Sequence, residues 1–182
     1  MVGFLSKLFG ARRVEAGTLG VLDLCGDKAA ALVAADRAAL APLFRVVSES
    51  TGQPPRCNLL LLYCTIENDG RIVGHSLGLR EIIRDSGAPI VIVAMPNSGE
   101  SYNGAAKGRS YGRANLVMTL DRKGDAFGRF FQRLFAEMKQ GTSMPLAWVK
   151  LAPQAPGIAH TDCPDTIFAC ELGQLAFASD ER

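Results

Sequence analysis

The sequence has few of the features from which a function is usually inferred. Its 182 residues include two histidines and one tryptophan, and its five cysteines form no Cys-x-x-Cys pair. No Gly-x-Gly-x-x-Gly fingerprint follows an apolar run, and neither a phosphate-binding P-loop nor a Gly-x-Ser-x-Gly motif is present. No motif therefore indicates nucleotide binding or the chemistry of a serine hydrolase.

The chain also has little net charge and no long apolar run. The formal net charge is +2, so we expect no nucleic-acid partner. No run approaches the roughly 20 apolar residues that cross a bilayer. Residues 1–13 have an apolar side, but a segment of about two to three turns binds lipid weakly. We therefore do not expect membrane contact through residues 1–13.

The cysteines indicate a reducing compartment. Their number is odd, and the N-terminal apolar segment is too short for a secretory signal and lacks a cleavage-like site. Reduced thiols in a cytoplasmic protein act as small hydrophobic residues when they are buried. We accordingly expect a cytoplasmic location, no cofactor and no metal.

The most informative stretch is a pair of apolar runs separated by an amphipathic segment. Residues 58–64 read NLLLLYC, residues 89–95 read PIVIVAM, and the amphipathic residues 76–85 lie between them. Short apolar runs bounded by turn residues are typical of strands covered on both faces. This pattern predicts a βαβ unit with Cys64 at the carboxyl end of its first strand, where ligands collect in open α/β sheets.

The remaining segments extend the same pattern. We expect further strands at residues 18–25, 115–120 and 166–172, and helices at residues 29–40, 126–140 and 143–151. Asp27 and Asp125 are expected to cap two of these helices. Pro42 either kinks the first helix or begins a second one through Val46 and Val47. The prediction is an α/β fold, a three-layer sandwich with a mainly parallel sheet of about five to six strands, whose last strand can run antiparallel.

Residues 1–16 are expected to form a tail or a short amphipathic helix, and residues 17–182 a single domain. Residues 97–114 form a long polar stretch with many glycines, which we interpret as a loop. The stretch is locally basic and carries Lys107, Arg109, Tyr111 and Arg113. We expect these side chains to take part in binding.

In order, the predicted elements resemble the CHAT domain, a caspase-like fold. The likeness covers roughly residues 19–177. It is best in LLLLYC at residues 59–64, which a glycine-containing loop follows, and in SLGLREIIRDSGAPIVIVA at residues 76–94. The paired helices of residues 127–151 also look like that family. The resemblance implies that Cys64 occupies the position of the nucleophilic cysteine.

One departure from the family bears on function. The catalytic histidine of the family lies at the end of the strand before the cysteine strand, where this chain reads Leu24-Cys25-Gly26. The histidine therefore does not carry over. We predict a non-catalytic caspase-like domain that binds a protein or peptide, with Asp23 and Cys25 as further candidate binding residues.

Two alternatives remain open. In the first, the chain is a cysteine hydrolase, in which Cys64 acts with His75 or His160 as the base that forms the thiolate. In the second, it is a small-molecule-binding α/β domain of another family. The last predicted strand is apolar enough to need covering, so we also expect that a symmetric dimer can form through it.

Overall fold

The structure is a computed structural model, and it describes residues 11–106, 114–152 and 162–178. The main sheet of these residues has six strands, in the order β3-β2-β4-β5-β6-β7. Their bounds are β2 (Thr18–Asp23), β3 (Val46–Ser50), β4 (Leu59–Tyr63), β5 (Ile90–Val93), β6 (Asn115–Asp121) and β7 (Asp165–Cys170). All neighbouring pairs are parallel except β6 and β7, which are antiparallel.

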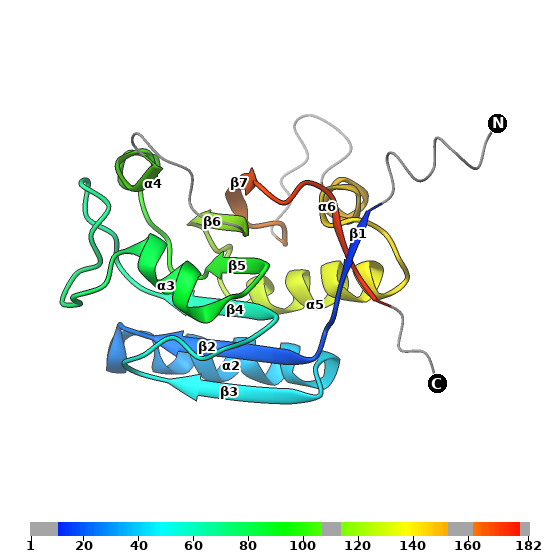
Figure 1. The fold of residues 1–182 in the computed structure, drawn as a ribbon, viewed down its shortest axis with the longest axis horizontal. Helices are drawn as coiled ribbons and strands as arrows, with labels where there is room; N and C mark the ends of the chain where they lie inside the picture. Colours follow the sequence, from blue (N-terminus) through cyan, green and yellow to red (C-terminus); the bar gives the residue numbers. More distant parts are fainter. Residues whose placement is uncertain (1–10, 107–113, 153–161, 179–182) are drawn as a thin grey trace.

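Helices cover both faces of this sheet (Figure 1). The α-helices within the described ranges are α2 (Ala30–Leu40), α3 (Leu79–Ser86), α4 (Gly99–Ala106), α5 (Ala126–Lys139) and α6 (Met144–Leu151). The core beneath α2, α5 and α6 lies on one face, and the core beneath α3 and α4 lies on the other. The predicted three-layer α/β sandwich with a mainly parallel sheet and an antiparallel last strand is confirmed.

The sequence of strand β4 is apolar throughout because both faces of this strand are buried. Successive side chains of a strand point to opposite faces of the sheet. Leu61 and Tyr63 pack on the side of α2 and α5, whereas Leu62 and Cys64 pack on the side of α3 and α4. All of them are buried. The register therefore places Cys64 at the carboxyl end of β4, beneath α3 and α4.

Helix α5 supplies much of the core on its side. It follows the prediction closely and ends near Gly141, which has a φ of 93°. Trp148 of α6 lies 4.6 Å from the ring of Phe130 and 4.6 Å from that of Phe168 in β7, so the aromatic contacts join both helices to the sheet. The buried face of α5 carries Phe127, Phe130, Phe131, Leu134, Phe135 and Met138. Burying each large apolar side chain contributes about 1.5–3 kcal/mol.

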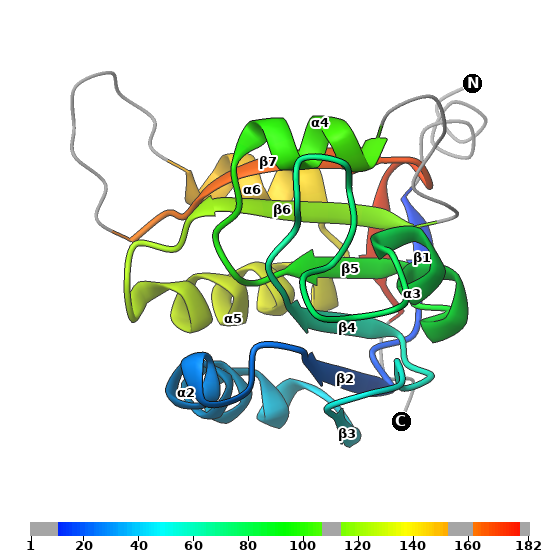
Figure 2. The same cartoon turned by 90° about the vertical axis from the view of Figure 1, so that its left-hand side faces the viewer.

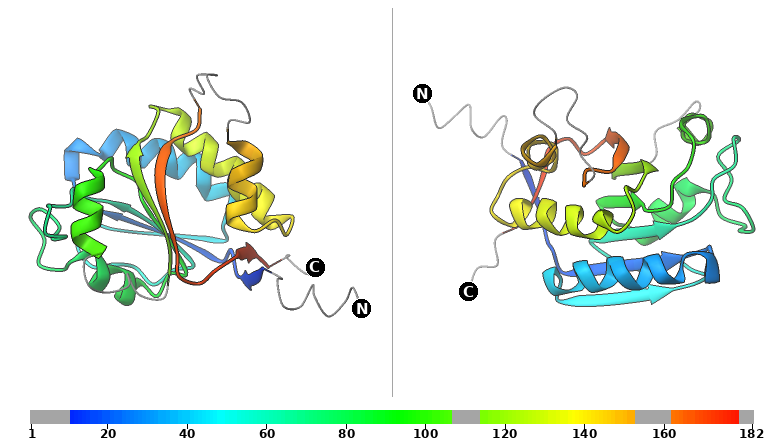
Figure 3. Two further views of the ribbon diagram at one scale, coloured as in Figure 1. Left: turned by 90° about the horizontal axis from the view of Figure 1, so that it is seen from above. Right: turned by 180° about the vertical axis from the view of Figure 1, so that it is seen from behind.

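Two short strands form a second sheet. Strand β1 (Arg12–Val14) pairs in parallel with β8 (Leu175–Phe177), and Arg13 donates a hydrogen bond from Nη1 to the Phe177 carbonyl at 2.9 Å. This pair lies beside α6, as Figure 3 shows. Part of the expected tail, residues 12–14, is thus a strand, while residues 1–10 lie outside the described residues.

Pro42 does begin a second helix, but this is a short 3₁₀ helix that ends before Val46, so the expected continuation through Val46 and Val47 was wrong. Residues 41–43 form a 3₁₀ turn, after which Phe44 is extended, with φ −123° and ψ 150°. Val46 and Val47 then pair with Thr18 and Leu19 in the edge strand β3. The β-branched valines favour the strand once the proline has ended the helix.

Asp125 stands at the N-cap position of α5, as expected, but its side chain makes no capping hydrogen bond. The expected cap by Asp27 is wrong, because Ala29 is the N-cap residue of α2. Asp27 lies within a 3₁₀ turn before α2, and Asp125 has a helical backbone of its own. The long stretch of residues 97–114 is also not all loop, since Gly99–Ala106 form α4. Within the ranges that the structure describes, no helix is long and apolar enough to cross a membrane.

Candidate functional site

Cys64 lies directly after β4 at the carboxyl edge of the sheet, as expected. Its side chain is 0% exposed and belongs to the core beneath α3 and α4. Burial raises the pKa of the thiol far above its ordinary range, and the nearby Cys25 adds to the rise. The backbone is held as well, because Asn97 donates a hydrogen bond from Nδ2 to the Cys64 carbonyl at 3.2 Å. The thiol is therefore kept neutral and away from solvent.

Both ring nitrogens of His75 have partners other than Cys64. Nε2 lies 3.0 Å from the Gly52 carbonyl, and Nδ1 accepts a hydrogen bond from the Leu77 backbone N–H at 3.1 Å. The latter bond holds the ring against its own loop. His160, the other candidate base, lies outside the described residues.

The antiparallel β7 brings the start of that strand to the carboxyl edge of the sheet. β7 is three strands away from β4, which at about 4.8 Å per step is about 14 Å across the sheet. Cys163 packs on the side of α5, whereas Cys64 packs on the opposite face. The structure therefore does not bring Cys163 to Cys64.

Asp23 and Cys25 shape the end of β2. Asp23 Oδ1 accepts hydrogen bonds from the backbone N–H groups of Cys25 and Gly26, at 2.8 and 3.1 Å. Burial raises the pKa of the Cys25 thiol, and the Asp23 carboxylate raises it further, while Thr65 opposes the rise by hydrogen bonding. These contacts explain both residues as parts of a turn. The other candidate binding residues, Lys107, Arg109, Tyr111 and Arg113, lie outside the described residues.

Asn97 is a polar residue of this edge that the sequence analysis missed. Its Oδ1 accepts a hydrogen bond from the Ile66 backbone N–H at 2.7 Å, and its Nδ2 donates to the carbonyls of Cys64 and Met95. A single side chain thus joins the loop after β4 to the loop after β5. The residue following it, Ser98, accepts a hydrogen bond from the Ser101 N–H at 3.0 Å in the first turn of α4.

The loop after β4 doubles back and packs against α4, as Figure 2 shows. Ile66 and Ile72 form an antiparallel bridge within it. Its contact with α4 depends on two glycines. A β-carbon at Gly104 would lie 1.9 Å from the Asn68 carbonyl oxygen, and one at Gly70 would lie 2.5 Å from Ala105 Cα. We call this segment, residues 65–73, the β4 loop.

A pocket of about 470 Å³ opens between the β4 loop, the first turn of α3 and the end of α4. Charges of both signs line it, from Asp69 and Arg71 in the loop and from Arg80 and Glu81 in α3. Arg80 also donates a hydrogen bond from Nη2 to the Ala105 carbonyl at 2.9 Å, which ties α3 to α4. The pocket is polar, and Cys64 is not among its lining residues.

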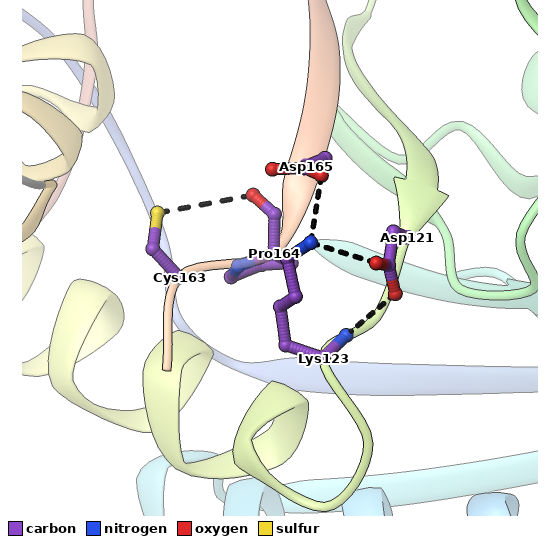
Figure 4. Close-up of polar contacts among 5 residues, drawn as sticks. All are labelled: Asp121, Lys123, Cys163, Pro164 and Asp165. Carbon is purple, nitrogen blue, oxygen red and sulfur yellow. Dashed lines mark hydrogen bonds and ion pairs between the residues drawn. The ribbon is translucent and has the colours of Figure 1, made fainter. Parts of the chain in front are cut away.

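A second polar cluster lies where β6 ends and β7 begins (Figure 4). Lys123 Nζ lies 2.7 Å from Asp121 Oδ2 and 2.8 Å from Asp165 Oδ2. The hydrogen bond from Lys123 lowers the pKa of Asp121. The lysine occupies the space between the two carboxylates. Across the described ranges, no group of three or more histidine, cysteine, aspartate or glutamate side chains is arranged to hold a metal ion.

Comparison with known proteins adds no relative: no protein-family model, curated protein or solved structure matches this chain.

Proposed function

We propose that this chain is a non-catalytic, caspase-like α/β domain that binds a protein or peptide. The observation that carries the proposal is the complete burial of Cys64. A cysteine nucleophile acts as the thiolate and needs a cationic or basic neighbour together with access for the substrate. Burial instead raises the pKa of this thiol, and His75 is bonded to other groups.

The arrangement of the strands supports the caspase-like part of the proposal. The sheet is parallel up to β6 and its last strand is antiparallel, which is the layout that the resemblance implies. The position of the family histidine, at the end of β2, is held by residues whose contacts form a turn. The dimer through β7 stays a prediction, and it is compatible with the place of this strand at the edge of the sheet.

The binding surface that we propose is the one formed by the β4 loop, the first turn of α3 and α4. Its pocket of about 470 Å³ is large enough for one or two side chains of a partner. The carboxylates and guanidinium groups around it can hydrogen bond to peptide groups and to charged side chains. Residues 107–113 follow α4 in the chain and lie outside the described residues, and their tyrosine and basic residues stay candidates for binding the partner.

A second candidate function is the binding of a small polar molecule in the same pocket. Its volume falls within the range of about 300–1,000 Å³ that is usual for ligand sites. The lining by Asp69, Arg71, Arg80 and Glu81 favours a zwitterionic or polar ligand over an apolar one. No contact among the described residues supports the alternative of a cysteine hydrolase.

Thiol labelling of the native protein tests the non-catalytic assignment. We expect iodoacetamide to modify the exposed Cys170 first, and Cys64 at least 100-fold more slowly, because Cys64 reacts only after the fold opens. Peptide mapping by mass spectrometry identifies the labelled residue. Labelling of Cys64 faster than that of a free thiol would contradict the proposal and favour the hydrolase.

Peptide selection against the full chain tests the binding surface. We expect selected peptides to lose at least threefold in affinity for the Arg71→Ala variant, because its side chain lines the pocket and is well exposed. Arg129→Ala is the matched control, since this exposed arginine belongs to α5 on the other face of the sheet. Equal loss in both variants, or in neither, would place the peptide elsewhere. Saturable binding of free amino acids alone would favour the small-molecule candidate.

A further inference from the structure

Helix α6 buries one side and leaves large apolar side chains on another. Met144 and Ala147 are fully buried, whereas the side chains of Leu146 and Val149 are 55% and 59% exposed. Residues three positions apart lie on the same side of a helix. Leu146 and Val149 thus form an exposed apolar patch, which is a feature of contact surfaces.

The patch borders a groove of about 530 Å³. The groove lies between α6, the turn that precedes it and the chain just before β1, so that Thr142, Gln174 and Ala11 contribute to its walls. A polar rim runs along one side, where Lys150 Nζ lies 2.8 Å from Glu137 Oε2. The groove is therefore apolar along α6 and charged at one margin.

The patch and the groove together indicate the chemistry of an occupant. Apolar side chains would cover Leu146 and Val149, and polar groups would face the charged margin at Lys150. A segment with apolar side chains and peptide groups meets both requirements.

We propose that this occupant is the N-terminal segment of the same chain, residues 1–10. The segment continues directly from Ala11, a wall of the groove. The chain is fixed at that point, because the backbone N–H of Arg12 donates to the Gln174 carbonyl at 2.7 Å. The sequence of the segment, MVGFLSKLFG, includes the large apolar side chains of Phe4, Leu5, Leu8 and Phe9.

The length of the segment suits the distance that it has to cover. Ten residues reach up to about 33 Å when extended and about 15 Å as a helix. The eight residues of α6 span about 12 Å. The segment can therefore run along α6 from Ala11 to Leu146 and Val149 in either conformation.

A double-mutant cycle in the full chain tests this contact. Leu8→Ala and Leu146→Ala are made singly and together, and the unfolding equilibrium constants are measured by urea titration. We expect the two substitutions to be coupled by at least threefold. Leu8→Ala combined with Val73→Ala is the control, because Val73 is 46% exposed and lies in the β4 loop, outside the groove. The effects of these two substitutions on the free energy of unfolding should be additive.

Methyl NMR of the native protein provides a readout that does not depend on stability. We expect Leu8→Ser to shift the methyl signals of Leu146 and Val149, and Lys7→Gln to leave them in place. Absence of both the coupling and the shifts overturns the proposal. Shifts that appear only at concentrations where sedimentation detects a dimer overturn it in favour of a second copy, and shifts that need anionic vesicles overturn it in favour of a lipid surface.

Discussion

Arg122 and Asp36 form a buried ion pair in which a single nitrogen, Arg122 Nη2, lies 3.0 and 2.8 Å from the two carboxylate oxygens. Tyr63 donates a hydrogen bond to Asp36 Oδ2 at 2.7 Å, and Arg122 Nη1 donates to the Ala94 carbonyl at 2.8 Å. Burial raises the pKa of Asp36, while Arg122 and Tyr63 lower it. The pair joins α2 to the carboxyl ends of β4, β5 and β6.

Removing one partner of this pair should destabilise the fold strongly. Arg122→Met leaves the Asp36 carboxylate buried without its cation, which costs about 3–5 kcal/mol in comparable pairs. The variant also loses the contact of the guanidinium with the Phe127 ring, whose centroid lies 3.9 Å away. Urea unfolding of the variant and the parent measures the difference in the free energy of unfolding.

An exposed ion pair serves as the control. Arg37 and Glu49 interact at the surface, and Arg37→Met should cost at most about 1 kcal/mol. Replacing both buried partners, with Arg122→Met and Asp36→Leu together, should recover part of the loss. A cost below about 1 kcal/mol for Arg122→Met alone would mean that the buried pair is not what holds α2 to the sheet.

Gly104→Ala should disrupt the packing of the β4 loop on α4. The added β-carbon would lie 1.9 Å from the Asn68 carbonyl oxygen, so the backbone of the loop has to move. We expect a loss of about 1–3 kcal/mol in the free energy of unfolding. Faster amide hydrogen exchange in residues 65–73 would localise the effect.

Gly99→Ala is the matched control within the same helix. No heavy atom lies within 4 Å of the β-carbon that this change adds. Alanine favours a helix over glycine, so the stability of this variant should stay equal or rise. If both glycine variants behave alike, the close approach of the β4 loop to α4 is not required for stability.

Cys57 should make the fold sensitive to alkaline pH. Burial raises the pKa of its thiol from the ordinary 9.0 to about 12. The folded state binds this proton more tightly than the unfolded state. The stabilising contribution is therefore complete below about pH 9 and is lost as the pH rises towards 12. This thiol alone should lower the free energy of unfolding by about 1.4 kcal/mol per pH unit in that window.

The measurement for Cys57 compares urea unfolding near pH 8 and near pH 11. Between these pH values the free energy of unfolding should fall less in Cys57→Ala than in the parent. In Cys170→Ala, which removes an exposed thiol, it should fall nearly as much as in the parent. Equal slopes in the parent and the Cys57 variant would show that this thiol ionises as readily in the fold as in the unfolded chain.

Lys123 should control the titration of Asp121. Its hydrogen bond lowers the pKa of that carboxyl, so Lys123→Met should move the pKa back up towards 3.8. A carboxyl group whose pKa is lowered in the fold stabilises the fold at pH values above its ordinary pKa. This stabilisation is lost on acidification. The variant should accordingly lose less stability between neutral and acidic pH. Carboxyl-carbon NMR follows the titration directly, and Lys150→Met, which removes a partner of Glu137, should leave Asp121 unchanged.

Local patterns account for most of the predicted fold. The apolar strands and the phenylalanine face of α5 are evident from short-range periodicity, because burial on one or two faces leaves a repeating pattern. Residues 46–50 were predicted wrongly because valines that follow a possible helix are compatible with a helix and with a strand. Their pairing with β2 decides the matter, and that pairing involves residues 28 positions earlier in the chain. Helix α4 was missed because its short, glycine-containing sequence has low helix propensity.

The candidate site was less predictable than the fold. The position of Cys64 followed from its strand, but its burial depends on α3 and α4, which cover that end of the sheet. Asp36 looked like an ordinary helix residue, since its partner Arg122 lies 86 positions away. Asn97 likewise bonds to groups on two different loops. Such contacts arise only from the assembled topology and leave no local signal.

Strand β1 has a consequence for how the chain acquires its structure. Among the described strands, β1 pairs with β8 and no other, and Arg13 bonds to a carbonyl 164 positions further on. During translation, residues 12–14 therefore cannot form their hydrogen bonds to β8 until residue 177 has left the ribosome. The pair can close only after residues 12–177 have all been made. A nascent chain arrested shortly before β8 should thus be cleaved by protease near residue 14, while β2 to β5 are already resistant.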